Sequence, residues 1–103
     1  MNLGDLFKQA KDVQARAEAM QAQLATIEID GLSGAGMVRV VLSGKGELKR
    51  VTLDPSLLKP EDAQLVQDLL VAAHADAKAK LERRVAEEMK ALAGSLGLPP
   101  GLV

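Results

Sequence analysis

The sequence predicts an α+β fold in which a three-stranded antiparallel sheet is flanked by two long helices, in the order α-β-β-β-α. Three observations lead to this prediction: a long heptad pattern at the start, two short alternating runs around a glycine turn, and a second long stretch without helix breakers. The 103 residues match the size of one domain. We expect this domain to span residues 1–97, followed by a flexible tail containing proline and glycine at 98–103.

The first helix is expected from about Leu3 to Ile27. Asn2 suits the N-cap, and Asp5 in the first turn places a negative charge where the helix dipole favours it. Apolar residues recur with alternating steps of three and four, which is an unbroken heptad seam. The seam consists of Leu3, Leu6, Ala10, Val13, Ala17, Met20, Leu24 and Ile27.

The middle of the chain is expected to form the sheet. A short segment, 28–33, ends in the turn signal 33–36. In Met37–Ser43, the apolar residues Val38, Val40 and Leu42 then alternate toward one face, as in a strand. Glycines at 44 and 46 favour a tight hairpin turn, so Glu47–Leu53 becomes the returning strand.

A two-residue hairpin loop fixes which residues face each other. It places Val40 opposite Val51 and Val38 opposite Leu53. The other face of the hairpin would then be too apolar for plain solvent, which points to a partner. That face is expected to show Met37, Val41 and Leu48 beside Arg39 and Arg50.

The second helix is expected from Pro60 to about Ala93, ended by Gly94 and Gly97. At 1.5 Å per residue the two helices would measure roughly 36 Å and about 50 Å, whereas a compact domain of this size has a radius of gyration of about 13 Å. They must project, and their apolar seams need cover, so we expect a homodimer with protruding helical arms. The predicted core and dimer residues are Leu6, Val13, Met20, Leu24, Val38, Val40, Val51, Leu70, Leu81 and Val85.

Composition excludes several classes of function. One phenylalanine is the only aromatic residue, which argues against proteins that stack bases on aromatic rings, such as RRM and OB domains. The absence of cysteine excludes disulfides, thiol catalysis and cysteine-ligated metal. The N-terminus lacks the apolar run of a signal peptide, and the longest apolar run, Leu69–Ala73, is too short to span a membrane. We therefore expect a soluble, cytoplasmic protein with no membrane partner.

Residues that resemble catalytic or binding motifs are better explained by structure. His74 is the only histidine and has no suitably spaced helical partner. Asp54 and Ser56 fit a turn, and the glycine loops do not precede a helix as phosphate loops do. Glu87 and Glu88 fit a solvated helix face. We expect no catalytic residue, cofactor, metal or small-molecule substrate.

Charge is unevenly distributed, although the formal net charge is only -1. The hairpin and the distal second helix are locally basic. On the helix, cations lie opposite the apolar stripe, which fits either an ordinary solvated face or a site for an anion such as a DNA backbone. The hairpin cations Arg39, Lys49 and Arg50 are a competing site. If that anion is a DNA backbone, we favour Lys80, Arg83, Arg84 and Lys90 on the second helix, with Lys8 and Lys11 on the first, as the DNA-binding residues.

Short motifs lie at 34–40, 44–45, 48–51, 54–58, 68–69, 72–73, 76–77 and 98–101, and a further one lies in the first helix at 20–24. In this order and spacing they resemble the YbaB/EbfC family of bacterial nucleoid-associated DNA-binding proteins. The resemblance implies a homodimer with a central sheet and protruding helices, often described as tweezers. It also implies sequence-tolerant binding of double-stranded DNA, nucleoid organisation and gene regulation. The family commonly has an aromatic residue near the middle of the second helix, where this chain has His74.

The function predicted is therefore that of a non-enzymatic, dimeric nucleoid protein that binds double-stranded DNA. The main alternative is a protein-interaction scaffold whose heptad arms grip another protein, linked to recombination or repair machinery because genes of the family often lie beside recombination and replication genes. A metal- or nucleotide-dependent enzyme has no positive support in the sequence. Salt dependence of DNA binding separates the first two, because phosphate contacts release counterions.

Overall fold

The computed structural model describes residues 2–95 and Gly97, so the predicted tail at 98–103 lies outside the described residues. The order of elements confirms the α+β prediction. Along the chain, one long helix precedes the three-stranded antiparallel sheet and the other follows it. Short 3-10 turns lie in the connections after the first and third strands. The elements are α1 (Leu3–Thr26), β1 (Glu28–Ser33), β2 (Val38–Ser43), β3 (Leu48–Leu53) and α2 (Ala63–Ser95), with 3-10 turns at Gly34–Gly36, Pro55–Leu57 and Pro60–Asp62.

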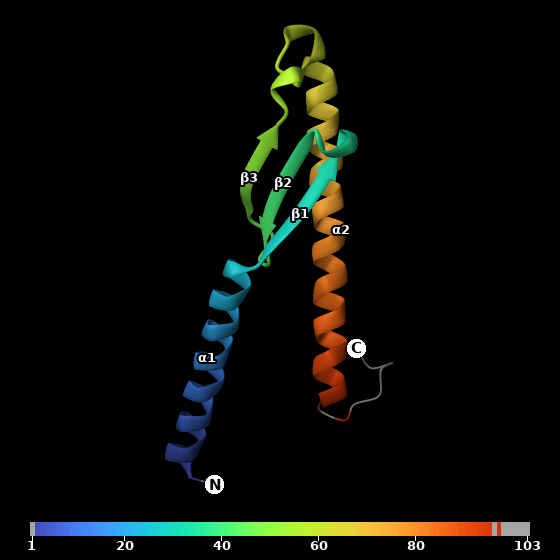
Figure 1. Cartoon of the computed structure of the whole chain (residues 1–103). Coiled ribbons are helices and arrows are strands. Elements are labelled where there is room, and N and C mark those ends of the chain that lie inside the picture. The colour runs from blue at the N-terminus through green and yellow to red at the C-terminus, as the bar shows by residue number, and fades with distance from the viewer. Residues whose placement is uncertain (1, 96, 98–103) are drawn as a thin grey trace.

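The molecule is elongated because both helices extend past the sheet. The sheet lies beside the N-terminal half of α2, and α1 leaves the end of the sheet so that the two helices diverge (Figure 1). The extents of 69 × 29 × 16 Å and the radius of gyration of 19.8 Å exceed the value of about 13 Å for a compact chain of this size. The predicted projection of the helices is thus confirmed.

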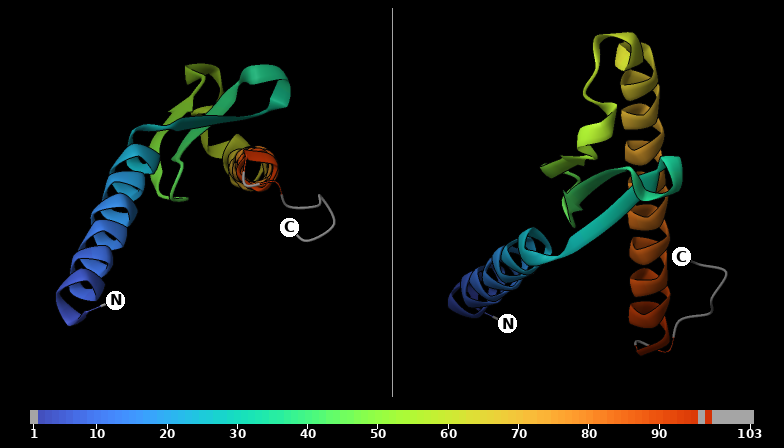
Figure 2. Two further views of the ribbon diagram at one scale, coloured as in Figure 1. Left: turned by 90° about the horizontal axis from the view of Figure 1, so that it is seen from below. Right: turned by 45° about the horizontal axis from the view of Figure 1, so that its top comes forward.

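Helix α1 covers neither face of the sheet, as two further views show (Figure 2). Asn2 Oδ1 accepts the Asp5 N–H at 2.8 Å, which is the predicted cap. At the other end, the Gly44 N–H donates to the Leu24 carbonyl at 2.9 Å and ties α1 to the β2–β3 hairpin. Leu24 is half-buried, and every other α1 side chain is exposed. The seam residues Leu6, Val13 and Met20 therefore contribute nothing to the core of a single chain.

The strand register matches the expected hairpin at one end and departs from it at the other. Val38 pairs with Leu53 and Val40 with Val51, as expected. A bulge between Val41 and Leu42 then places Leu48 opposite Leu42. The prediction that Leu48 lies on the face away from α2 is therefore wrong, because one extra residue in β3 returns its side chain to the α2 side.

The core lies between α2 and the first two strands. It consists of Val38, Val40, Leu42, Leu57, Ala73 and Ala77. Met37, expected on the opposite face, packs against this core instead. A Cβ on Gly31 would lie 2.1 Å from the Ala73 carbonyl oxygen, so glycine in β1 and alanines in α2 allow close backbone approach.

The second helix differs from its predicted bounds at both ends. Pro60–Asp62 form a 3-10 turn, and α2 begins at Ala63 and continues through Gly94 to Ser95. Gly94 does not end the helix, because a helical glycine costs only about 1 kcal/mol relative to alanine. Leu70 and Leu81 are half-buried, whereas Val51 and Val85 are exposed in the single chain.

Candidate nucleic-acid interface

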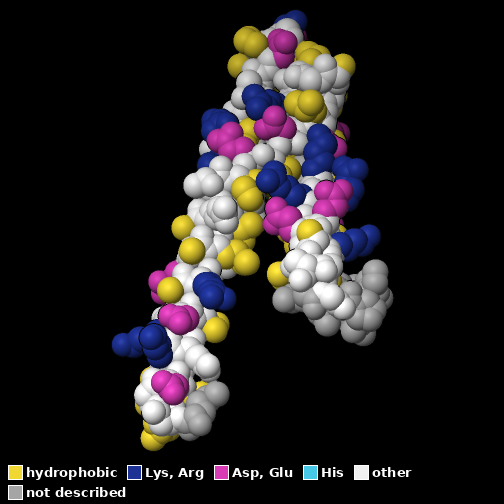
Figure 3. Space-filling model, turned by 60° about the horizontal axis from the view of Figure 1, so that its bottom comes forward, with side chains coloured by type: hydrophobic (Ala, Val, Ile, Leu, Met, Phe, Trp, Pro, Cys, Tyr) yellow, Lys and Arg dark blue, Asp and Glu magenta, His cyan; other side chains and the backbone are white. Residues whose placement is uncertain are grey.

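The distal part of α2 presents the cations that sequence reasoning selected. Arg83, Arg84 and Lys90 are exposed, and Lys80 is half-buried. A shallow hollow of about 250 Å³ is lined by Lys80, Arg83, Arg84 and Glu87. Lys and Arg side chains gather along the outer side of this arm, mixed with acidic ones, while hydrophobic side chains lie near the notch between the arms (Figure 3). The arm therefore offers positive charge on a projecting surface.

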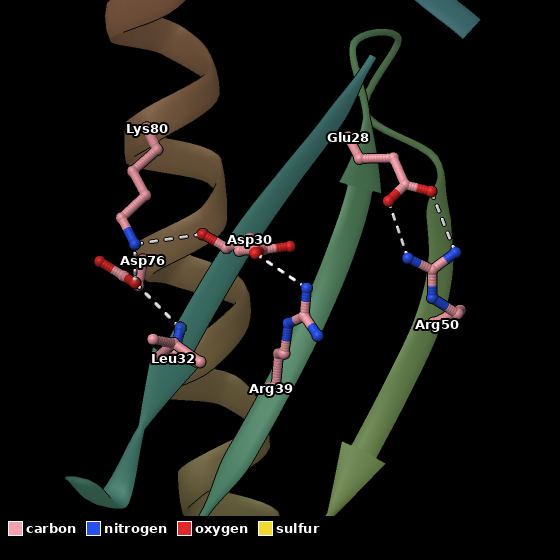
Figure 4. A network of polar contacts seen from close by, with 7 residues as sticks. All are labelled: Glu28, Asp30, Leu32, Arg39, Arg50, Asp76 and Lys80. Carbon is pink, nitrogen blue, oxygen red and sulfur yellow. Dashed lines mark hydrogen bonds and ion pairs between the residues drawn. The ribbon is translucent and has the colours of Figure 1, made fainter. Parts of the chain in front are cut away.

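Lys80 is engaged within the chain. Its Nζ lies 2.9 Å from Asp76 Oδ2 and donates to the Asp30 carbonyl at 3.1 Å. The same Asp76 oxygen accepts the Leu32 N–H at 2.9 Å (Figure 4). This backbone hydrogen bond, and then Lys80, hold the pKa of Asp76 below its ordinary value. Lys80 thus joins β1 to α2.

Arg83, Arg84 and Lys90 are held less firmly. Arg84 Nε lies 3.5 Å from Glu88 Oε1, one turn further along the helix. Exposed pairs of this spacing contribute only about 0.3–0.5 kcal/mol, so a phosphate can displace the carboxylate. Within residues 2–95, Arg83 and Lys90 form no ion pair. Arg83 and Lys90 are therefore free to meet an external anion, and Arg84 needs only to exchange one exposed carboxylate for it.

The α1 cations are placed on the other arm. Lys8 and Lys11 are exposed, and Lys8 shares a shallow hollow of about 400 Å³ with Asp5, Gln9 and Asp12. Because α1 and α2 diverge, the two sets of cations are not brought together (Figure 1). Any contact of both sets with one ligand requires a ligand that spans the arms.

The competing hairpin cations are paired with carboxylates of β1. Arg50 donates twice to Glu28, at 3.0 and 2.8 Å, and Arg39 donates to Asp30 at 2.9 Å. Lys49 Nζ lies 3.7 Å from Glu28. The hydrogen bond from Arg50 holds the pKa of Glu28 below its ordinary value, and Glu28 raises that of Arg50. Two carboxylates therefore offset most of the charge of these three cations, and the pairs of Arg39 and Arg50 are drawn in Figure 4.

Two apolar hollows flank these charged surfaces. One, of about 300 Å³, lies between the C-terminal part of α1 and the C-terminal part of α2. It is lined by Met20, Gln23, Leu24, Ile27, Val85, Glu88, Met89 and Leu92. The other, of about 390 Å³, lies between β3 and α2 and contains His74. The second hollow was not predicted from the sequence, because no sequence pattern near β3 indicates that α2 leaves most of this strand exposed.

Two further features bear on the kind of site. Across residues 2–95 and 97, no three histidine, cysteine or acidic side chains lie close enough to hold a metal ion. None of the helices in the same residues is long and apolar enough to cross a membrane.

Known proteins resemble this chain along nearly its whole length. A nucleoid-associated protein of Rhodopseudomonas palustris is 54% identical over 97 residues, which cover 94% of this chain and 92% of the relative. One from Granulibacter bethesdensis is 50% identical over 101 residues, covering 98% and 94%. The crystal structure of an uncharacterized Helicobacter pylori protein matches with a TM-score of 0.69 and 28% identity, covering 93% and 97% of the two chains.

The sequence model of the YbaB/EbfC DNA-binding family matches residues 1–96. This is not a family of enzymes, which agrees with the non-enzymatic function predicted from the sequence. With a match over almost the entire chain and relatives at about half identity, the resemblance found in the short motifs is confirmed. The chain belongs to the YbaB/EbfC DNA-binding family.

Proposed function

We propose that this protein binds double-stranded DNA with low sequence specificity, acts as a homodimer in the cytoplasm at the nucleoid, and contributes to nucleoid organisation and gene regulation. One observation supports this most strongly. Arg83, Arg84 and Lys90 are exposed on a projecting arm, while the sheet cations are paired with β1 carboxylates. The names of the relatives and the family description point to the same partner.

The proposed contacts are with phosphates rather than base edges. Arginine and lysine that neutralise phosphates release counterions, and this contribution to affinity does not depend on sequence. A protein that recognises base edges places several arginine, asparagine or glutamine side chains on a helix that enters the major groove. The exposed distal face of α2 carries arginine and lysine interspersed with Glu82, Glu87 and Glu88, without such a set. Low specificity follows from this composition.

The decisive experiment removes charge from one surface at a time. The arm variant carries Arg83→Ala and Arg84→Ala, and the hairpin variant carries Lys49→Ala and Arg50→Ala. Binding of each variant to a random DNA duplex is measured over a range of salt concentrations. Each lost phosphate contact reduces the slope of log K against log salt by about 0.9. We expect the magnitude of this slope to fall by up to about 1.8 in the arm variant, which loses two cations, and to stay unchanged in the hairpin variant.

Lys80 provides an internal control on the same helix. Because it bonds to Asp76 and to the Asp30 carbonyl, Lys80→Met should lower the stability of the protein more than it changes the salt slope. Circular dichroism confirms that each variant stays helical. Loss of DNA binding in the hairpin variant, with full binding in the arm variant, would place the site on the sheet and reject the arm.

The apolar hollow between the C-terminal parts of α1 and α2 favours a second candidate, a protein-interaction scaffold. Its lining is dominated by Met20, Leu24, Ile27, Val85 and Met89, and apolar surfaces of this kind hold protein helices. Binding there would depend little on salt, because burial of apolar surface rather than phosphate contact would drive it. Met20→Glu should abolish such binding and leave the salt slope for DNA unchanged.

A further inference from the structure

The turn between β2 and β3 holds the C-terminal end of α1. The Gly44 N–H donates to the carbonyls of Leu24, at 2.9 Å, and Ile27, at 3.2 Å. Lys49 Nζ adds a longer, exposed bond of 3.4 Å to the Ala25 carbonyl. The last carbonyls of a helix have no partner within it, and the last turn of α1 contains no basic residue. The hairpin therefore caps α1 from a distant part of the chain, chiefly through Gly44.

Position 44 needs glycine for close approach rather than for a turn. Gly46 in the same turn has a φ of 86°, whereas the backbone of Gly44 is not left-handed. A Cβ on Gly44 would lie 2.6 Å from the Leu24 carbonyl oxygen and 3.3 Å from Ile27 Cβ. Cβ atoms essentially never approach other atoms within 3.0 Å, so any other residue here would push α1 away from the hairpin.

The turn that carries Gly44 is itself fixed. Ser43 is 3% exposed, and its Oγ accepts the N–H groups of Lys45, at 3.1 Å, and Glu47, at 3.2 Å. The Gly46 N–H donates to the Ser43 carbonyl at 2.9 Å, and the Ser43 N–H to the Glu47 carbonyl at 2.8 Å. The Gly44 N–H is therefore a rigid support, set by the sheet, for the end of α1.

The two arms are attached to the sheet differently. Asp76 and Lys80 bond α2 to β1, and the backbone of α2 touches that of β1 at Gly31. Helix α1 covers neither face of the sheet, and its side chains are exposed apart from the half-buried Leu24 (Figure 2). The angle between the arms therefore depends on the contact of Gly44 with the end of α1.

We propose that Gly44 is a positioning residue for DNA binding, because it fixes the separation between Lys8 and Lys11 on α1 and the cations of α2. This inference rests on the DNA binding proposed above. Phosphates of a duplex recur at fixed spacings, so both sets of cations can contact one duplex only at a matching separation. Gly44 touches no phosphate in this scheme and acts through α1.

The size of the effect follows from the geometry of the helix. Ordinary contact begins at 3.4 Å, so an added Cβ requires the Leu24 carbonyl to withdraw by about 0.8 Å. Taken up over one helical turn of about 5.4 Å, this movement tilts α1 by about 8°. Gln9 precedes Leu24 by fifteen residues, which is about 22 Å along the helix, and therefore moves by about 3 Å.

The first measurement is the distance between the arms. Because the chain has no cysteine, Gln9→Cys and Ala86→Cys, both at exposed positions, accept spin labels at these two sites alone. Pulsed electron–electron resonance is measured with the labelled chain diluted in unlabelled protein. Gly44→Ala should shift the distance by about 3 Å or broaden its distribution. Lys45→Ala is the matched control, because it changes the same turn but removes a side chain that pairs with Glu47 rather than with α1.

The second measurement is the salt dependence of binding to a random duplex. Lys8→Ala with Lys11→Ala removes two cations and should lower the magnitude of the slope by up to about 1.8. Gly44→Ala removes no charge, yet we expect the same reduction. Combining all three substitutions should lower the slope no further. A loss of stability alone would not make these effects coincide.

The wild-type protein keeps the inference testable if Gly44→Ala does not fold. We expect a single narrow distance between the labels and slow hydrogen exchange of the Gly44 N–H. A broad distance distribution in the wild type would overturn the inference, as would a Gly44→Ala protein with the wild-type salt slope, whatever its distance. In both cases the proposed function stands as long as the wild type binds the duplex. A wild type that binds no duplex would reject the proposed function and the role of Gly44 together.

Discussion

Gly31 brings the backbones of β1 and α2 into contact, and its replacement by alanine tests the packing of the whole domain. The added Cβ would lie 2.1 Å from the Ala73 carbonyl oxygen and 2.6 Å from both N and Cβ of Ala77. Real Cβ atoms are essentially never closer than 3.0 Å to such neighbours, so something must move. Two of the three contacts are with backbone atoms, which no side-chain rotation can relieve.

The cost follows from the nature of these contacts. Overpacking a core typically destabilises by about 1–3 kcal/mol. Because β1 as a whole must shift away from α2, we expect the upper end, about 3 kcal/mol or more, against a total stability of about 5–15 kcal/mol. For a domain of this size that lowers the melting temperature by about 12–24 °C.

Thermal unfolding at fixed protein concentration measures the effect. Gly94→Ala is the control, since no atom lies within 4 Å of the added Cβ and the site is within α2. That substitution should raise stability by up to about 1 kcal/mol, because alanine favours the helix. A Gly31→Ala protein that melts with the wild type would show that β1 and α2 are not in backbone contact, and the described packing would be refuted.

Three further predictions concern the core, the cap and the charge network. Leu42→Ala should cost about 2–5 kcal/mol in urea unfolding, because Leu42 is 1% exposed, whereas the exposed Leu58→Ala should change little. Asn2→Ala should cost about 1 kcal/mol of helix stability, seen as lower helicity by circular dichroism. The pKa values of Glu28 and Asp76 are lowered in the folded state, so their contribution is present above their unfolded pKa values and is lost as the pH falls through the folded ones. The urea midpoint should therefore decline below about pH 4, less steeply in Asp76→Asn, and an unchanged slope in that variant would contradict the assigned role of Asp76.

Local patterns predicted the elements of the fold well. The heptad seam from Leu3 to Ile27 and the alternation around the glycine turn each depend on residues close in sequence. They gave the first helix and the pairing of Val40 with Val51. The bulge near Leu42 escaped prediction, because Lys49, the extra residue in β3, is not a glycine and carries no local signal.

Contacts between distant segments could not be predicted. A heptad seam shows that a helix has apolar surface to bury, but not which surface covers it, so the sequence predicted projecting helices without identifying what packs against α1. The candidate site shows the same limit. Arg39 and Arg50 were counted as free cations, since their partners Asp30 and Glu28 belong to another strand and come within reach only through the register of β1 on β2.

The same kinds of side chain serve two purposes in this molecule, and position in the fold decides between them. Over the sheet, each arginine has a carboxylate opposite it across the strands, so its charge orders β1 against its neighbours. Beyond the sheet, α2 has no strand beside it, and Arg83 and Lys90 lack such carboxylate partners among the described residues. Lys80 lies at the boundary between these regions and bonds to the last strand that α2 passes. The unpaired positive charge of the arm therefore begins where the sheet ends, which is why we propose the DNA contacts on the part of α2 that projects beyond the sheet.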